Sequence, residues 1–525
     1  MLIQRIKTVC IASALLVAAT SCDITTEPKS TVTDATIFQD KNNYRAFLAK
    51  LYAGLVVTGQ QGPHGNGDFQ RLDEGFTQYT RQLWQLQTLP TDEAVIGWGD
   101  AGLPEMIFQT WASANQFVQM MYSRVFYQVS LVNEFLRETT DEKLAERGHS
   151  DMSAEIADYR AEARFLRALS YWHGIDLFGD IPLVTEESGL GSTPPEQSTR
   201  QAIFDYIVSE LTAIKGDLPA AGAGQYGRAD QGALSMLLAK VYMNAEVYVG
   251  TDRYSDAMTE LNTILAGTYE LNSNYHANFL ADNHTSLEII FAVPQDGVNT
   301  RTWGNLTFLA HASCGGSMDN ADYGLDGCWW GLRAQPELVA MFPAPQDASP
   351  DGRAIFYTDG QNLQIASISN FNDGWAAPKY QNVTSTGEPG SHGTYPDTDY
   401  PMFRLADAYL MYAELHLRGG GGDRATALGY VNQLRQRAYG NQSGNIADAE
   451  LTLDFVLDER ARELWWEGHR RTDLIRYGLF TGGTYIWSWK GGTQAGGATP
   501  EYLNLYPIPA SELVANPNLQ QNEGY

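Results

Sequence analysis

The sequence has 525 residues and a formal net charge of −27, and 43% of its residues are hydrophobic. A chain of this length and apolar content can bury a large core, which excludes disorder as its main state. The negative charge excludes nucleic acid as a partner, because phosphate binding needs a basic surface. It also argues against wide contact with anionic lipid. A neutral ligand or a protein partner fits better.

The N-terminus carries a targeting segment. Arg5 and Lys7 precede a short apolar run, and small polar residues lead from that run to Cys22. Because the run is too short to span a bilayer, residues 1–21 are predicted to be a signal peptide. A cysteine at this position is typical of a bacterial lipobox, so Cys22 is predicted to be lipidated; an ordinary signal peptide with a coincidental cysteine is the alternative. The Thr- and Pro-containing residues 22–40 predict a flexible tether.

Apolar residues three and four positions apart are the main structural signal along the chain. This spacing predicts helices over residues 41–55, 104–138, 160–178, 200–215, 229–247, 254–266, 403–417, 424–437 and 452–477. Residues 69–103 are predicted to mix short extended pieces with turns, and the four glycines at 419–422 to link two helices. Tryptophans that lie in helical patterns are predicted to be core residues; they are Trp111, Trp172, Trp465 and Trp466.

The best organised segment is residues 160–182. Its apolar face includes Phe165 and Trp172, and several small residues leave room for a neighbouring helix to approach closely. Gly179 permits a left-handed turn at the C-terminus, and Pro182 keeps the helix from resuming. The segment is therefore predicted to be the central helix of a packed helical array.

Paired helices joined by short turns suggest tetratricopeptide-like packing, although a strict repeat is absent. The predicted fold is mostly α, with an α-solenoid scaffold of such helix pairs over about 41–270 and 400–480. Between 275 and 400, Gly, Asn, Asp and aromatic residues dominate and helical periodicity fades. Together with 60–103, this region predicts a loop-rich ligand-binding face on a rigid scaffold. We expect residues 41–525 to form one domain.

Besides Cys22, two cysteines, Cys314 and Cys328, remain in the predicted mature chain. In an oxidising compartment a disulfide between them is plausible. Two free, partly buried thiols are an equally good interpretation of the sequence.

Four blocks together resemble the SusD/RagB family of outer-membrane glycan-binding lipoproteins of polysaccharide utilisation systems. They are residues 160–182, residues 395–414 with Phe403-Arg404-Leu405-Ala406-Asp407, residues 459–476 beginning Glu459-Arg460-Ala461-Arg462-Glu463, and residues 506–525 beginning Tyr506-Pro507-Ile508-Pro509. They follow the family's order. The likeness is closest to the family's starch-binding founder, through segments such as Asp73-Glu74-Gly75 and Leu89-Pro90-Thr91-Asp92-Glu93.

The resemblance implies a mostly α-helical fold in which four tetratricopeptide-like helix pairs support a loop-rich ligand face. It implies no catalysis and no cofactor, and a lid-like role on a TonB-dependent transporter of the SusC type. The protein would sit on the cell surface at the outer membrane, held by its lipid anchor. Some relatives hold a structural calcium, but the loop at residues 282–285 is short and poor in acids, so no metal site is predicted.

Neutral sugars are bound by stacking their C–H faces on aromatic rings and by hydrogen bonds from fixed polar side chains. By resemblance, Trp98 matches the aromatic residue of the family's starch site, and Trp303 stands where the starch binder has a tyrosine. The third aromatic residue falls at Trp329 or Trp330, where the alignment is ambiguous by a residue or two. Core packing is the alternative for each. An arc of three aromatic rings would suit the curved helix of an α-glucan.

The polar members of the site are also assigned by resemblance. Asp73 and Arg81 match the polar pair of the starch site, and a structural ion pair between them is the alternative. The family's asparagine just after the first aromatic residue has no clear match. Asp100 is the nearest substitute.

The predicted function is a lipid-anchored surface protein that captures starch-like α-glucan and delivers it to its transporter partner. The nearest alternative is the same role for another glycan, such as a laminarin-type β-glucan. A surface adhesion or assembly module that binds protein is the alternative of another class. An enzyme is not expected, because the sequence has no Gly-x-Ser-x-Gly motif and because His392 and His469 lack metal-ligand spacing.

Overall fold

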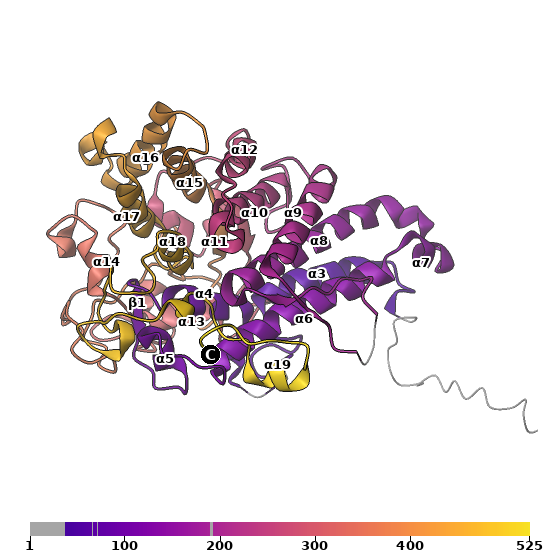
Figure 1. Ribbon diagram of the computed structural model, residues 1–525. Helices are drawn as coiled ribbons and strands as arrows, with labels where there is room; N and C mark the ends of the chain where they lie inside the picture. Colours follow the sequence, from indigo (N-terminus) through magenta and orange to yellow (C-terminus); the bar gives the residue numbers. More distant parts are fainter. Residues whose placement is uncertain (1–36, 66, 71, 190–192) are drawn as a thin grey trace, which may run out of the picture. The chain divides into compact units, whose positions relative to one another are not determined.

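A computed structural model describes residues 37–65, 67–70, 72–189 and 193–525 (Figure 1). The predicted signal peptide and Cys22 lie outside the described residues. The chain divides into two compact units, Met1–Tyr44 and Arg45–Tyr525. The second unit contains every residue of the predicted ligand face.

The described part of the chain is mostly helical, which confirms the predicted fold class. The longer helices are α3 (Asn42–Val56), α4 (Tyr79–Thr88), α6 (Gln116–Glu138), α8 (Ser153–Phe178), α9 (Arg200–Ile214), α10 (Gln231–Met243), α12 (Tyr254–Leu265), α15 (Leu405–Leu417), α16 (Arg424–Tyr439) and α17 (Leu453–Leu464). The shorter ones are α5 (Leu103–Phe108), α7 (Asp141–Glu146), α11 (Ala245–Val249), α13 (Asn305–Ala312), α14 (Pro336–Ala340), α18 (Arg470–Arg476) and α19 (Ala510–Ala515). Across the described ranges, none is both long and apolar enough to cross a membrane.

The helices pack as pairs, and the predicted central helix, α8, lies against two of its neighbours. α6 packs against α8 and α8 against α9, while α10 pairs with α12 and α15 with α16 (Figure 1). Phe165 and Trp172 of α8 are buried, and Gly179 ends the helix with a φ of 74°. The predicted left-handed turn is therefore confirmed.

Three predicted helices are interrupted. The one expected over 229–247 is divided at Asn244 into α10 and α11. The helix expected over 104–138 is divided into α5 and α6, because Gln109 takes a φ of 51° and Asn115 caps α6 by accepting hydrogen bonds from two backbone N–H groups. The helix expected over 452–477 ends at Leu464 and restarts as α18, with Trp466 at a φ of 60° between them. The four tryptophans predicted to be core residues are all buried, and three of them lie in these breaks: Trp111, Trp465 and Trp466.

The prediction that residues 69–103 lack a helix is wrong. α4 lies there and is buried along its whole length. Among its polar side chains, Gln82 donates to the Phe76 carbonyl and Gln87 donates to the Asp176 carboxylate. Its apolar residues Tyr79, Leu83 and Leu86 recur at helical spacing, but the helix is only ten residues long and lies among turn-rich segments, so the pattern is short. α13 is buried throughout in the same way, inside the region expected to be loops.

Strands form three antiparallel pairs. They are β1 (Ala94–Ile96) with β5 (Leu332–Ala334), β2 (Ile181–Pro182) with β3 (Gln197–Ser198), and β4 (Ile289–Val293) with β6 (Tyr400–Arg404). In the first pair, Ile96 lies opposite Leu332. This pair joins two segments of the predicted ligand face that are far apart in sequence.

The block over residues 459–476 builds the interior of the scaffold. Arg404 on β6 bonds to Glu463 and Glu467, and Arg353 bonds to Glu459 and Glu463, all of them buried. Burial alone would raise the pKa of Glu463, but the surrounding guanidinium groups hold it well below its usual range. Losing one partner of such a cluster leaves an uncompensated buried charge, which is strongly destabilising.

Candidate ligand-binding site

The pairing of β1 with β5 brings two aromatic loops together. Beyond the last strand pair, the Gly97 N–H donates to the Gly331 carbonyl at 2.9 Å, which extends the ladder by one residue. Trp98 follows β1 at this end, and Trp329 and Trp330 precede β5 at the same end. Their side chains therefore start from adjacent stretches of backbone.

Three of the predicted aromatic residues are in contact. The Trp98 Nε1–H donates to the Trp329 carbonyl at 3.1 Å, and the two ring centroids are 6.3 Å apart. The ring of Trp303 lies 6.0 Å from that of Trp329 on its other side. All three side chains are half-buried. We call Trp98, Trp329 and Trp303 the aromatic arc.

Trp330 takes a different position from the arc. It is 51% exposed, and its ring packs against Phe371 with a centroid distance of 5.8 Å. Its φ of 55° is uncommon for a bulky side chain. The alignment left Trp329 and Trp330 as alternatives; the ring contacts join Trp329 to the arc and leave Trp330 as a separate exposed ring beside it.

His311, on α13, supports the central ring of the arc. Its imidazole stacks on Trp329 with centroids 4.6 Å apart and planes 20° from parallel. Its Nδ1 lies 2.6 Å from the Gly327 carbonyl and its Nε2 lies 2.9 Å from the Thr394 carbonyl. Burial lowers the pKa of His311, while these two carbonyl contacts oppose the shift. A neutral imidazole has one N–H, so it donates to one of these two carbonyls. That hydrogen bond and the stacking contact together restrain His311 against Trp329.

A disulfide holds the base of the loop that carries two of these tryptophans. Cys314 and Cys328 are bonded, with their Cα atoms 4.8 Å apart. Cys328 directly precedes Trp329, and the Cys314 carbonyl accepts a hydrogen bond from the Trp330 N–H at 3.0 Å. The bond therefore restrains the backbone at the centre of the site.

Arg81, on α4, lies beneath the arc and is only 3% exposed. Its guanidinium group sits 4.0 Å above the Phe308 ring and 5.9 Å from that of Trp98. Its Nε donates to Gln85 and its Nη1 donates to the Trp303 carbonyl at 3.2 Å. The buried Nη2 has no hydrogen-bond partner. An unpaired buried donor of this kind is costly unless a ligand satisfies it.

The predicted acids surround Arg81 without forming an ion pair with it. Asp73 is exposed and caps the short 3-10 helix Glu74–Thr77 by accepting from the Gly75 N–H at 3.0 Å. Although both side chains are described, no ion pair joins Asp73 to Arg81. Burial lowers the pKa of Arg81 to about 9, while the charges of Asp73, Asp100 and Glu74 oppose the shift. Asp100 is half-buried on the same loop as Trp98.

Three further residues shape the site without having been predicted from the sequence: Glu74, Phe308 and His311. Glu74 accepts from the Trp303 N–H at 2.8 Å and so fixes the backbone of the third ring. The only hint of Glu74 in the sequence was its place in the Asp73-Glu74-Gly75 segment, which resembles the family. Nothing in the sequence around Phe308 and His311 marks them, because they lie on a buried helix in a region without helical periodicity.

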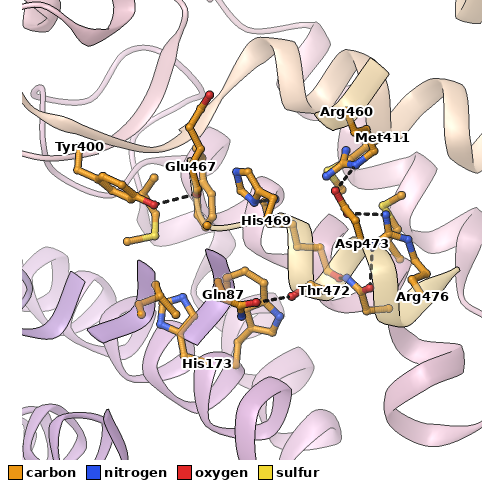
Figure 2. A pocket seen from close by; sticks show the side chains of 18 residues that line it. Gln87, His173, Tyr400, Met411, Arg460, Glu467, His469, Thr472, Asp473 and Arg476 are labelled. Carbon is orange, nitrogen blue, oxygen red and sulfur yellow. Dashed lines mark hydrogen bonds and ion pairs between the residues drawn. The ribbon is translucent and has the colours of Figure 1, made fainter. Parts of the chain in front are cut away.

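A small enclosed cavity also lies in the scaffold, between helices that include α8, α10 and α18 (Figure 2). Its volume is about 30 Å³, enough for roughly one water molecule and too small for a sugar ring. In Figure 2, Asp473 bonds to both Arg460 and Arg476. Burial lowers the pKa of His173 and of His469, on its wall, to about 3. This cavity is a junction of buried ion pairs rather than a ligand site.

Comparison with known proteins gives the family. Residues 351–525 match the model of the SusD family. The starch-binding protein SusD of Bacteroides thetaiotaomicron is 34% identical, and the match covers 100% of this chain and 99% of that protein. A SusD-like protein, P25, of Formosa agariphila is 24% identical over 99% of this chain and 100% of its own. The chain therefore belongs to the SusD family.

Solved structures share the fold. A SusD superfamily protein from Parabacteroides distasonis has a TM-score of 0.71 at 22% identity, covering 94% of this chain and 100% of that one. Surface glycan-binding protein A of Bacteroides thetaiotaomicron, solved in complex with laminarihexaose, has a TM-score of 0.67 at 20% identity, covering 92% and 99%. The arc and Arg81 lie outside residues 351–525, so the region matched by the family model contains none of these site residues.

Proposed function

We propose that the protein binds a starch-like α-glucan at the aromatic arc. The observation that carries the proposal is the contact of Trp98, Trp329 and Trp303, three half-buried indoles from three separate loops. Aromatic rings of this kind bind the C–H faces of neutral sugars. Their planes are tilted by 45° and 49° from one ring to the next, which suits a curved chain better than a flat one.

Polar groups beside the arc supply the hydrogen bonds that a sugar needs. Asp100 carries a half-buried carboxylate on the same loop as Trp98. The guanidinium group of Arg81 lies 5.9 Å from the Trp98 ring, with its unpaired Nη2 buried, so a sugar would reach that donor only if the rings above it shift. A guanidinium group donates to hydroxyl oxygens and a carboxylate accepts from hydroxyl hydrogens. Asp73 offers a second, exposed carboxylate, and Trp330 offers a further exposed ring.

We further propose that the protein is a lipid-anchored surface protein that delivers the glycan to a SusC-type TonB-dependent transporter. Two observations support this role. The predicted lipobox at Cys22 would attach the chain to the membrane, and the starch-binding protein SusD matches it along its whole length. The role is one of binding and transfer, without catalysis.

The second candidate ligand is a laminarin-type β-glucan. It is favoured by the similar fold of surface glycan-binding protein A, which was solved with laminarihexaose. The replacement of the family's tyrosine by Trp303 removes a hydroxyl group from the site and would also change which glycan fits. The same arc would serve either ligand, so the experiment has to compare glycans directly.

The test is retardation of residues 23–525 in native gels that contain amylopectin, pullulan, dextran, laminarin or xylan. We expect amylopectin and pullulan to retard the protein, and Trp98→Ala to abolish the effect. Tyr502→Ala, which removes an aromatic residue that is 39% exposed and outside the arc, is the matched control and should migrate like the wild type. Retardation by laminarin alone would mean that the ligand is a β-glucan and not an α-glucan. Retardation by none of the glycans would overturn the proposal and favour a protein-binding module.

A further inference from the structure

A large cavity adjoins the aromatic arc on the far side of Trp303. Its volume is about 720 Å³, within the range of about 300–1,000 Å³ typical of small-molecule sites. It lies between the loop after α3, the segment before α13 and the loop over residues 392–395. Trp303 belongs both to the arc and to the wall of this cavity. The two surfaces are therefore continuous.

Ring contacts continue from the arc into the cavity. The ring of Tyr395 lies 5.2 Å from that of Trp303, and the ring of His392 lies 5.0 Å from that of Tyr395. His64, which is exposed, meets the edge of Trp303 at 5.7 Å. Tyr395 is only 6% exposed, so it supports Trp303 while Trp303 and His64 face the open space.

The cavity wall offers hydrogen-bond donors. The Arg301 Nε–H donates to the Gly297 carbonyl at 2.9 Å, which leaves its η nitrogens without a partner among the described residues. The His392 Nδ1 accepts from the Thr394 N–H at 3.1 Å. A neutral imidazole that accepts at Nδ1 carries its proton at Nε2 and can donate from there.

Charged side chains are few on the described part of the cavity wall. No Asp or Glu is among the described residues that line it. Lys50 is the other cation there, and its ammonium group is already paired with Asp68 at 3.5 Å. Among the described lining residues, only Arg301 carries a guanidinium group, and its η N–H donors match the oxygens of sugar hydroxyls.

We propose that this cavity is a second part of the glycan site, which binds the sugar units that continue past Trp303. The inference rests on the proposed function, because it places further units of the same chain. Trp303 would then belong to both parts of the site, because its ring contacts Trp329 in the arc and Tyr395 in the cavity wall. It also makes Arg301 a determinant of the preferred chain length.

The test compares a trisaccharide with a heptasaccharide by isothermal titration calorimetry, in both the α-1,4-glucose and the β-1,3-glucose series. We expect the wild type to bind the heptasaccharide more tightly in the series that it recognises. Arg301→Ala should lower that affinity about tenfold, the loss expected for a hydrogen bond to a charged group, and leave the trisaccharide unchanged. Val298→Trp, at an exposed position on the cavity wall, should block the cavity and give the same pattern without removing a polar group.

Two controls separate this inference from the proposed function. Arg424→Ala removes an exposed arginine paired with Asp448 and should leave both affinities unchanged. Trp98→Ala should weaken both oligosaccharides, because it removes the arc itself. Equal affinity of the wild type for both lengths, or variants at Arg301 and Val298 that behave like the wild type, would overturn the inference and leave the proposed function standing. A wild type that binds neither length in either series would overturn both.

Discussion

The indole N–H of Trp98 donates to the backbone carbonyl of Trp329, at 3.1 Å and across 231 residues of sequence. The bond joins the loop after β1 to the loop closed by the Cys314–Cys328 disulfide. Because Trp329 also contacts Trp303, a change at one ring is expected to displace the others. The site should therefore respond to mutation as a unit, with non-additive effects.

Gly331→Ala is expected to disturb the site without removing any ring. A Cβ atom at Gly331 would lie 2.8 Å from the ring of Trp98, closer than two such atoms can approach, so the indole must move. We expect glycan binding to weaken at least about tenfold, or about 1.4 kcal/mol, with little change in unfolding temperature. Gly99→Ala is the matched control, because a Cβ there meets nothing within 4 Å. Normal binding by Gly331→Ala in native gels would contradict the assigned position of Trp98.

Arg81→Lys is expected to weaken binding although it keeps the positive charge. The guanidinium group of Arg81 bonds to Gln85 and to the Trp303 carbonyl while its Nη2 stays free. A lysine is a single point charge and cannot hold this planar set of donors. We expect affinity to fall about tenfold, the worth of one hydrogen bond to a charged group. Isothermal titration calorimetry with the glycan, at a temperature well below the unfolding temperature of the variant, measures this affinity. An unchanged affinity would mean that Arg81 only supports the fold.

Replacing Cys314 and Cys328 by serine is expected to reduce both stability and binding. A disulfide that closes a loop of about 15 residues contributes about 3 kcal/mol in the chain-entropy description. Freed from it, the backbone at Trp329 and Trp330 should become more mobile and the affinity should fall. Chemical unfolding and native gels measure the two effects. Binding equal to the wild type in the folded double variant would show that His311 alone suffices to hold Trp329.

Stability should depend on two buried histidines in the scaffold. Burial lowers the pKa of His173 and His469 to about 3, below the usual value of about 6.5. Between these values the unfolded chain binds protons that the folded protein does not. The free energy of unfolding contributed by each histidine is therefore present above pH 6.5 and is lost as the pH falls toward 3.

The measurement is the slope of unfolding free energy against pH for the wild type and for His173→Gln. Between pH 6 and pH 4 we expect this slope to be smaller in the variant than in the wild type, by up to about 1.4 kcal/mol per pH unit. Burial raises the pKa of Glu93 to about 8, which gives a contribution of opposite sign, so the difference between the two proteins is the informative quantity. Identical slopes would show that His173 is protonated in the folded state.

Helical periodicity was a good guide for longer helices. For α8, α9, α12 and α16, most predicted ends lie within a few residues of the observed ones, and the exception is the earlier start of α8. It missed α4 and α13, which have ten and eight residues and lie among turn-rich segments, where so short a pattern is hard to recognise. Breaks such as that at Trp466, with a φ of 60°, also carry no sequence signal, because tertiary packing imposes them.

For the candidate site, the sequence supplied the residues but not their arrangement. Resemblance to the family singled out Trp98, Trp303 and Arg81, and it left Trp329 and Trp330 as alternatives. Their ring contacts, the free Nη2 of Arg81 and the support from His311 became visible only in three dimensions. The disulfide was an open question in the sequence, and the structure has it bonded.

The amino-acid sequence by itself determined the helical class, the family and the kind of side chain available for binding. These properties depend on local periodicity, on composition and on contiguous motifs, all of which can be recognised along one chain. The tertiary structure decided which of those side chains meet. β1 and β5 are three residues long each and have no periodicity of their own, so their pairing follows from the packing of the helices around them. That pairing brings Trp98 to Trp329, while Glu74 and Arg81 hold the backbone of Trp303, whose ring meets Trp329.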